Sequence, residues 1–162
     1  MGLDQYLKAE MYFSAWEDNT DGKSHYVDIL SIMGMKDTKA CQTTPSLTVT
    51  VNVGYWRKAN QIHKWFVDNI QDGVDNCSSY RVERTQLQEL LKLCINILNT
   101  KGEKKMRQNA IKHLPTALGF FFGSTDVDSS YFSDLESTVH QLDQILHNTK
   151  FKKATFYYQS SW

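Results

Sequence analysis

The strongest alternation of apolar and polar residues lies in residues 47–53, Leu-Thr-Val-Thr-Val-Asn-Val. A period of two is typical of a β-strand that buries one face. Residues 3–14 also predict a strand, because they are rich in tyrosine, leucine and phenylalanine. Ala9 and Glu10 interrupt that pattern and leave a helix as the alternative. Residue content predicts two further strands, over residues 25–33 and 154–159.

Three segments space their apolar side chains by three and four residues, which predicts amphipathic helices. Residues 57–70 carry Ala59, Ile62, Phe66 and Ile70 at this spacing. Residues 85–99 and 130–147 repeat the pattern. The remaining segments predict connections: a turn over 17–24, an irregular stretch over 35–45, a loop over 75–79, a charged connector over 100–107 and a loop over 119–125.

The predicted order of elements is β-β-β-α-α-α-β. Strands that come early and helices that come later favour an antiparallel sheet with helices on one side. We therefore predict an α+β fold in which a small antiparallel sheet of about four strands supports three helices. A length of 162 residues, without a repeat or a linker, predicts a single domain over residues 1–162.

The charges of the chain limit its partners. Eighteen basic residues balance eighteen acidic ones, so the formal net charge is zero. We expect no general nucleic-acid binding through an overall field, although a local basic patch remains compatible with this balance. Lys104, Lys105 and Arg107 form one short basic cluster. No apolar run approaches the ~18 residues of a membrane span, and no signal peptide is visible, so we expect no membrane partner and a cytoplasmic location.

The cysteines and histidines do not indicate a metal site. Cys41, Cys77 and Cys94 contain no C-x-x-C pair, and we expect reduced thiols with Cys94 as a small core residue. The five histidines form neither H-x-H nor H-E-x-x-H. We therefore predict no metal and no cofactor, and the absence of a nucleophile motif leads us to assign no catalytic residue.

The segment from Gly54 to Phe66, G-Y-W-R-K-A-N-Q-I-H-K-W-F, combines aromatic, cationic, amide and imidazole side chains. One interpretation is an ordinary apolar helix face with polar neighbours. The other is a binding site at a strand–helix junction, where rings stack on a base and cations bind phosphate. On that hypothesis we assign Tyr55 and Trp56 to stacking, Arg57 and Lys58 to phosphate, and Asn60 and His63 to polar edges of the ligand. Tyr158 and Gln159 of the last strand are additional candidates.

Five stretches carry a likeness to a known family: M-G-L-D-Q-Y-L at the start, G-Y-W-R-K-A-N with I-H-K-W-F in the centre, L-P-T, G-F-F-F-G-S-T, and F-Y-Y-Q-S-S-W at the end. Together they resemble a family of small bacteriophage and prophage proteins of unassigned function. The resemblance implies a viral accessory protein in the cytoplasm of an infected bacterium, a class that often counters host defence. It implies no catalytic or binding residue.

These observations favour a protein that captures a small phosphorylated or nucleotide-like ligand and so sequesters a host defence signal. Two alternatives remain open. One is an inhibitor that binds a host protein through exposed aromatic side chains, since Trp, Tyr and Arg are also typical interface anchors. The other is an enzyme that acts on a nucleotide-type metabolite with His63 as general base. The sequence leaves the oligomeric state unknown.

Overall fold

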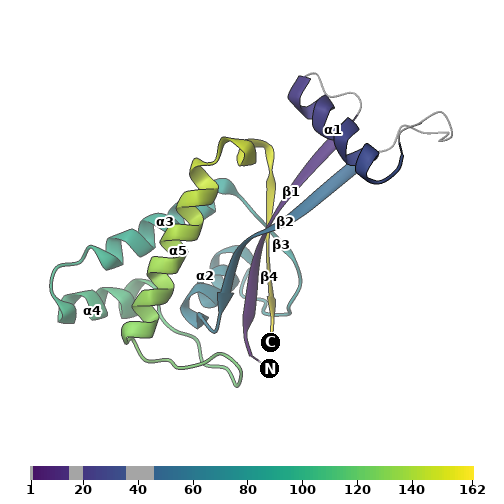
Figure 1. Ribbon diagram of the computed structural model, residues 1–162. Coiled ribbons are helices and arrows are strands. Elements are labelled where there is room, and N and C mark those ends of the chain that lie inside the picture. Colours follow the sequence, from purple (N-terminus) through teal and green to yellow (C-terminus); the bar gives the residue numbers. More distant parts are fainter. Residues whose placement is uncertain (1, 15–19, 36–45) are drawn as a thin grey trace. The chain divides into compact units, whose positions relative to one another are not determined.

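The computed structural model describes residues 2–14, 20–35 and 46–162. Figure 1 shows the elements in chain order: β1 (Asp4–Ser14), α1 (Thr20–Ile32), β2 (Ser46–Arg57), α2 (Asn60–Ile70), β3 (Tyr80–Val82), α3 (Arg84–Leu98), α4 (Glu103–His113), α5 (Ser129–His147), the 3-10 helix η2 (Thr149–Lys153) and β4 (Thr155–Ser161). Residues 17–19 of the expected turn and residues 36–45 of the expected irregular stretch lie outside the described residues.

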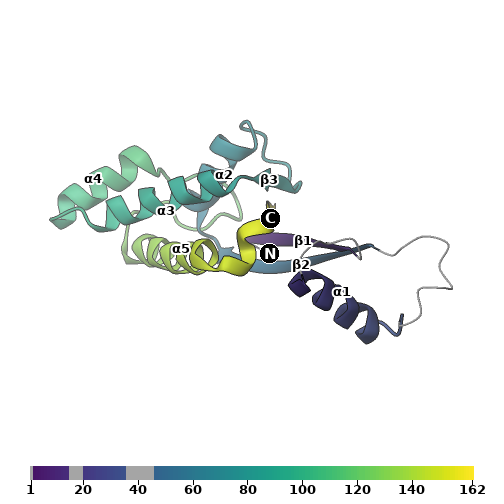
Figure 2. The same cartoon turned by 90° about the horizontal axis from the view of Figure 1, so that it is seen from above.

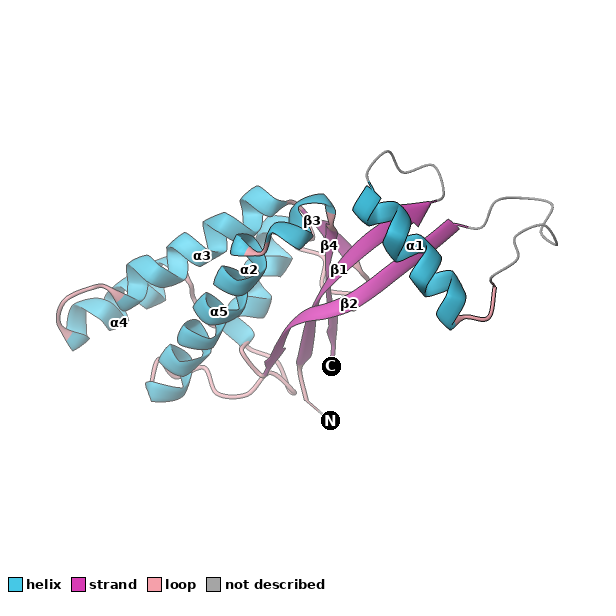
Figure 3. Cartoon of the chain, turned by 45° about the horizontal axis from the view of Figure 1, so that its top comes forward, coloured by secondary structure: helices cyan, strands magenta, loops and turns pink. Residues whose placement is uncertain are grey.

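The strands form one four-stranded antiparallel sheet in the order β2-β1-β4-β3 (Figure 3). The short β3 pairs with β4 in the register Tyr80–Tyr158, Arg81–Tyr157 and Val82–Phe156. The predicted α+β class and small antiparallel sheet are therefore confirmed. The predicted number of three helices is wrong, since the described residues form five α-helices.

The chain divides into two compact units, one formed by Met1–Ala9 with Asn52–Trp162 and the other by Glu10–Val51. We call them unit 1 and unit 2. The expectation of a single domain over residues 1–162 stays a prediction.

Unit 2 corrects one expected strand. Residues 25–33 were expected to be extended, but α1 runs to Ile32 and its last turn continues through the hydrogen bond from Met33 N to Ile29 O, 3.0 Å long. Tyr26 and Leu30 are both buried and stand four residues apart, which places them on one face of a helix. The spacing of Tyr26 and Leu30 indicates a helix, whereas the β-branched and aromatic residues of this segment favour a strand.

In unit 1, the sheet has one buried face. Along β1 the side chains of Gln5, Leu7 and Ala9 are buried, and those between them are partly exposed. The same alternation along β4 buries Phe156, Tyr158 and Ser160. The helices of this unit gather on one side of the strands (Figures 1 and 2). Unit 1 is thus a two-layer structure, in which the helices of the unit cover one face of its sheet.

The core of unit 1 lies between these layers. Phe66 of α2 stacks on Tyr158 of β4, with ring centroids 3.8 Å apart and an angle of 8° between the planes. Leucines of α3 and α5 fill the space between these two helices. Each such side chain contributes about 1.5–3 kcal/mol when it is fully buried. Cys94 is buried among them, and burial raises the pKa of its thiol to about 12, which confirms the expected core role.

Two further boundaries differ from expectation. The expectation of a charged connector over residues 100–107 is wrong, because α4 begins at Glu103. Arg107 forms an ion pair at 3.0 Å with Glu103, which lies one turn earlier in this helix. Only Ala110 of α4 is buried, so no apolar period marked this helix in the sequence. The helix expected from residue 57 begins instead at Asn60, because β2 extends to Arg57.

Candidate functional site

The junction between β2 and α2 separates the residues that were expected to form one site. Because β2 continues to Arg57, its period of two places Tyr55 and Arg57 on the outer face and Trp56 on the buried one. Tyr55 is 46% exposed and Trp56 only 3%. Lys58 then turns the chain with a positive φ of 59° before α2 starts. The side chains of this segment therefore do not converge on a single hollow.

Trp56 belongs to the core. Its indole Nε1 donates to the hydroxyl of Thr138 on α5 at 2.8 Å, and its ring lies 6.0 Å from that of Phe66. A buried indole with a satisfied N–H offers no face for stacking a ligand. Trp56 therefore fixes α5 to the sheet, which corrects the stacking role expected for it.

Asn60 is buried and binds the loop between α4 and α5 instead of a ligand. Its amide nitrogen donates to the carbonyls of Phe122, at 3.1 Å, and Ser124, at 2.7 Å. Its Oδ1 accepts from the backbone N–H of Ala117 at 3.1 Å. One side chain thus satisfies backbone groups at both ends of residues 117–124. The Asn60 side chain, which was expected to bind a polar edge of a ligand, binds backbone groups of the protein instead.

His63 and Tyr158 meet inside unit 1. The Nδ1 of His63 lies 2.8 Å from the Tyr158 hydroxyl, and its Nε2 lies 2.9 Å from Asp75 Oδ2. The Tyr158 hydroxyl also donates to Gln5 Oε1 at 3.0 Å, and Asp75 Oδ1 accepts from the indole of Trp162 at 3.1 Å. This chain of contacts connects β1, β4, α2 and the loop before β3.

The contact of a phenol, an imidazole and a carboxylate has the form of a general-base relay. Here, however, Tyr158 and His63 are both buried, and both ring nitrogens of His63 already have partners. Burial also raises the pKa of the Tyr158 phenol well above its ordinary value, so the hydroxyl stays protonated. The arrangement holds the loop around Asp75 and the last strand to the core, and both ring nitrogens of His63 contact these internal partners.

The outer face of the sheet carries a second group of polar and aromatic residues. The rings of Tyr6 and Tyr55 lie 5.4 Å apart at an angle of 44°. Asp4 Oδ1 accepts from the Tyr55 hydroxyl at 2.5 Å and from Arg57 Nη1 at 3.2 Å. Lys8 Nζ donates to Gln159 Oε1 at 2.7 Å. Tyr55, Arg57 and Gln159 are thus three of the expected site residues that share this face.

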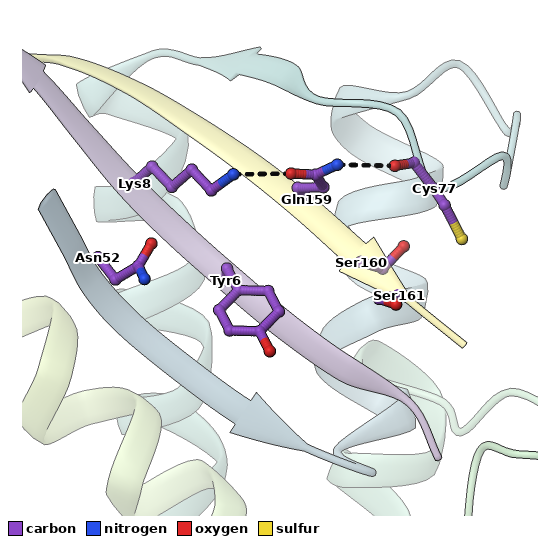
Figure 4. A pocket seen from close by; sticks show the side chains of 7 residues that line it. All are labelled: Tyr6, Lys8, Asn52, Cys77, Gln159, Ser160 and Ser161. Atoms are coloured by element: carbon purple, nitrogen blue, oxygen red, sulfur yellow. Dashed lines mark hydrogen bonds between the residues drawn. The ribbon is translucent and has the colours of Figure 1, made fainter. Parts of the chain in front are cut away.

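A hollow of about 350 Å³ lies on this face. Figure 4 shows the residues that line it, which are Tyr6, Lys8, Asn52, Cys77, Gln159, Ser160 and Ser161. Lys8, Gln159 and the carbonyl of Cys77 are joined across β1, β4 and the loop before β3, since Gln159 Nε2 donates to that carbonyl at 3.1 Å. We call these seven residues the outer-face hollow.

The electrostatics of the hollow favour an anion at Lys8. The hydrogen-bond partner of its ammonium group is the neutral amide of Gln159, and among the described residues no carboxylate forms an ion pair with Lys8. Arg57, by contrast, is paired with Asp4. The hydrogen bond to Asp4 raises the pKa of the Tyr55 phenol, so this ring remains neutral and its hydroxyl remains a donor.

Lys58 faces a different hollow, of about 260 Å³, at the start of α5. Arg57, Lys58 and Gln61 line it together with three carboxylates, those of Asp126, Asp128 and Asp134. Burial raises the pKa of Asp134, while the hydrogen bond from Gln61 Nε2 at 3.1 Å opposes that rise. With the carboxylates outnumbering the cations, this hollow does not favour the phosphate that was expected at Lys58.

Sequence reasoning missed Tyr6, Lys8, Asn52 and Cys77. Tyr6 and Lys8 were inside a segment expected to be a strand, so their common face could have been read from the period of two. The proximity of Tyr6 and Lys8 to Gln159 could not be predicted in this way, because it depends on the pairing of β4 with β1. Cys77 reaches the hollow from a loop in which its own φ is positive, at 58°.

Metal ligation and membrane insertion find no support in the part of the chain that is described. No group of three or more His, Cys, Asp and Glu side chains could hold a metal ion among these residues. No described helix has a stretch that is long and apolar enough to cross a membrane.

Comparison of the chain with known protein families, with curated proteins and with solved structures finds no match in any of the three. The resemblance to small phage and prophage proteins therefore stays a prediction. The function proposed below rests on the geometry of the outer face of the sheet.

Proposed function

We propose that this protein binds a small phosphorylated, nucleotide-like ligand at the outer-face hollow, and that it sequesters a host defence signal in this way. The observation that carries the proposal is the pairing of an uncompensated cation, Lys8, with the aromatic side chain of Tyr6 in one hollow. An aromatic face and a charge-assisted donor are the two contacts that a nucleotide requires.

The proposed roles follow from the positions of the side chains. Tyr6 and Tyr55 present rings to the base, and stacking on such a ring contributes about 1–3 kcal/mol. Lys8 binds the phosphate, and Gln159 and Asn52 offer amide groups to polar edges of the ligand. Arg57 stands beside Tyr55 with more than half of its side chain exposed, but it is paired with Asp4, so Lys8 is the residue assigned to phosphate.

Titration with nucleotides tests this proposal. Thermal shift and calorimetry are run with mononucleotides, cyclic dinucleotides and the matching nucleosides, which lack phosphate. Lys8→Gln removes the charge and keeps a donor, and it is expected to weaken nucleotide binding about 10-fold or more, since a charge-assisted hydrogen bond contributes about 1.5–3 kcal/mol. Lys92→Gln is the control, because it removes the same charge from an exposed position on α3, outside the hollow.

The result separates phosphate recognition from stacking. Nucleosides are expected to bind more weakly than nucleotides, and Tyr6→Leu is expected to weaken both. The proposal is abandoned if no nucleotide changes the melting temperature, or if Lys8→Gln and Lys92→Gln bind equally well.

A second candidate function is the inhibition of a host protein, and one loop favours it. Leu118 is 89% exposed and Phe120 is 94% exposed, which is unusual for large apolar side chains. The loop that carries them is held in place by Asn60, by the hydrogen bond from Leu3 N to the carbonyl of Phe121 and by a turn closed from Phe122 N to the carbonyl of Gly119. A rigid apolar tip loses little entropy on binding a pocket of a protein partner.

Retention of a stoichiometric protein partner tests this candidate. The double variant Leu118→Ser with Phe120→Ser is expected to lose a partner that the wild-type chain retains from bacterial lysate. Ile32→Ser is the control, since Ile32 is also large, apolar and highly exposed but lies on α1. Equal retention by both variants counts against a role of the loop.

A further inference from the structure

The helix α4 and the residue pair before it form one of the segments of the chain that are rich in positive charge. Residues 101–113 contain five cationic side chains, Lys101, Lys104, Lys105, Arg107 and Lys112, against the single carboxylate of Glu103, although the whole chain is neutral. Arg107 and Glu103 pair with each other. The lysines therefore form an excess of charge that this helix does not neutralise.

Helical geometry gathers three of these lysines on one face. Lys104, Lys105, Gln108 and Lys112 fall within about 100° of the helix circumference, because each residue turns the helix by about 100°. We call these four residues the lysine face. The buried Ala110 and the half-buried Met106, which packs against the core, lie on the opposite side. The lysine face thus points away from the core, and its members are exposed.

The members of the lysine face have no partner within the described structure. Lys104, Lys105 and Lys112 form no hydrogen bond or ion pair with any residue described. This differs from Lys64, which pairs with Asp68, and from Lys8, which donates to Gln159. Three exposed ammonium groups on one rigid element remain free for an external anion.

We infer that the lysine face of α4 binds the phosphate backbone of a nucleic acid, without reading its sequence. Lys104 and Lys112 are about 12 Å apart along the axis, at about 1.5 Å per residue. One strand of a duplex places a phosphate every 3.4 Å along its axis, so this length covers about three phosphates. The four residues of the face are polar, and the exposed Ile111 borders them on the same helix. Protein interfaces are depleted in lysine, and lysine is a common phosphate contact, so an acidic protein surface fits less well.

This inference does not depend on the outer-face hollow. It also differs from general nucleic-acid binding through an overall positive field, which the zero net charge of the chain disfavours. The contact is confined to one helix, and the rest of the surface contributes no overall attraction. Weak, salt-dependent and sequence-independent binding is the expected behaviour.

Salt-dependent binding tests the inference. Fluorescence anisotropy is measured with a labelled duplex of about 20 base pairs and a single strand of the same length, over about 25 to 200 mM salt. Three neutralised phosphates predict a slope of log K against log salt of about −2.7 on the duplex and about −2.1 on the single strand. The triple variant Lys104→Gln, Lys105→Gln and Lys112→Gln is expected to lose most of this slope and at least about 10-fold in affinity at the lowest salt.

The control removes the same number of charges elsewhere. The triple variant Lys64→Gln, Lys92→Gln and Lys152→Gln takes one lysine from each of α2, α3 and η2, has the same net charge as the lysine-face variant and is expected to keep the slope. Equal losses in the two variants would show that only net charge matters and would overturn the inference, as would the absence of wild-type binding at the lowest salt. Binding of polyglutamate as tight as that of the duplex, with the same loss in the lysine-face variant, would assign the face to an acidic protein instead. Circular dichroism verifies that both variants remain helical.

Discussion

Removal of the amide of Asn60 is the sharpest test of the structure around the junction of β2 and α2. Asn60→Ala deletes three hydrogen bonds, two to the carbonyls of Phe122 and Ser124 and one from the N–H of Ala117. Each partner is a backbone group of the loop that carries the exposed apolar tip. The substitution therefore changes how this loop is held and leaves the aromatic core unchanged.

The expected cost follows from the number of bonds. A hydrogen bond of this kind contributes about 1 kcal/mol net, so three of them contribute about 3 kcal/mol to the free energy of unfolding. Backbone groups that remain buried without a partner add to the cost, and groups that become hydrated reduce it. For a chain of this size, a loss of about 3 kcal/mol lowers Tm by roughly 6–12 °C.

Asn69→Ala on the same helix is the matched control. The Asn69 side chain makes one hydrogen bond, from Nδ2 to the carbonyl of Trp65 one turn earlier, and the residue is exposed. The chemical change is identical, and the gain in helix propensity is similar. We expect Asn69→Ala to cost about 1 kcal/mol or less.

Urea unfolding followed by tryptophan fluorescence measures both variants, and amide hydrogen exchange reports the loop itself. The N–H of Ala117 is expected to exchange faster in Asn60→Ala, because its acceptor is gone. If the two variants differ by less than about 1 kcal/mol, or if Ala117 keeps its protection, Asn60 does not hold the loop and the reasoning is wrong.

Three further predictions concern other contacts. Tyr158→Phe removes a buried hydroxyl with two partners and is expected to lower the free energy of unfolding by about 1–3 kcal/mol, measured by urea unfolding. Asp134→Asn is expected to raise Tm at neutral pH, because the raised pKa of Asp134 means that its ionised form is disfavoured in the folded state. That gain should disappear as pH falls below 3.8, the ordinary pKa of the group, where Asp134 is protonated in both states, and a pH series of thermal melts checks this. Gln141→Ala removes both hydrogen bonds between α5 and the backbone of Tyr55 on the edge strand, so Tyr55 N–H is expected to exchange faster.

The main features of the fold could be predicted where the apolar period was strong. The alternation in β2 and the leucine spacing of α3 and α5 identified these elements, because burial on one face leaves a pattern in the sequence. The helix α4 left none, since a single residue of it is buried. The helix α1 was mistaken for a strand, because residue preference was ranked above the spacing of Tyr26 and Leu30.

The candidate site could be predicted only in part, because its members depend on where β2 ends. A helix that included residues 56–63 would have placed Trp56, Asn60 and His63 along one stripe. The strand continues to Arg57 instead, and a period of two separates neighbours onto opposite faces. Tyr55, Arg57 and Gln159 then share the outer face, while Trp56 and the others serve the interior. No local pattern reveals the partnership of Lys8 and Gln159, which are distant in the chain.

The position of β4 has a consequence for the order in which the protein can assemble. This strand lies between β1 and β3, so the middle of the sheet includes a strand that is synthesised after the other three. Pairs so distant in sequence are slow to form, because a long loop must close before they gain any contact. Until β4 has emerged from the ribosome, β1 and β3 each present an unpaired edge that can associate with other chains. Folding of unit 1 is therefore expected to wait until β4 has emerged, and a nascent chain that stalls before Thr155 is expected to require a chaperone.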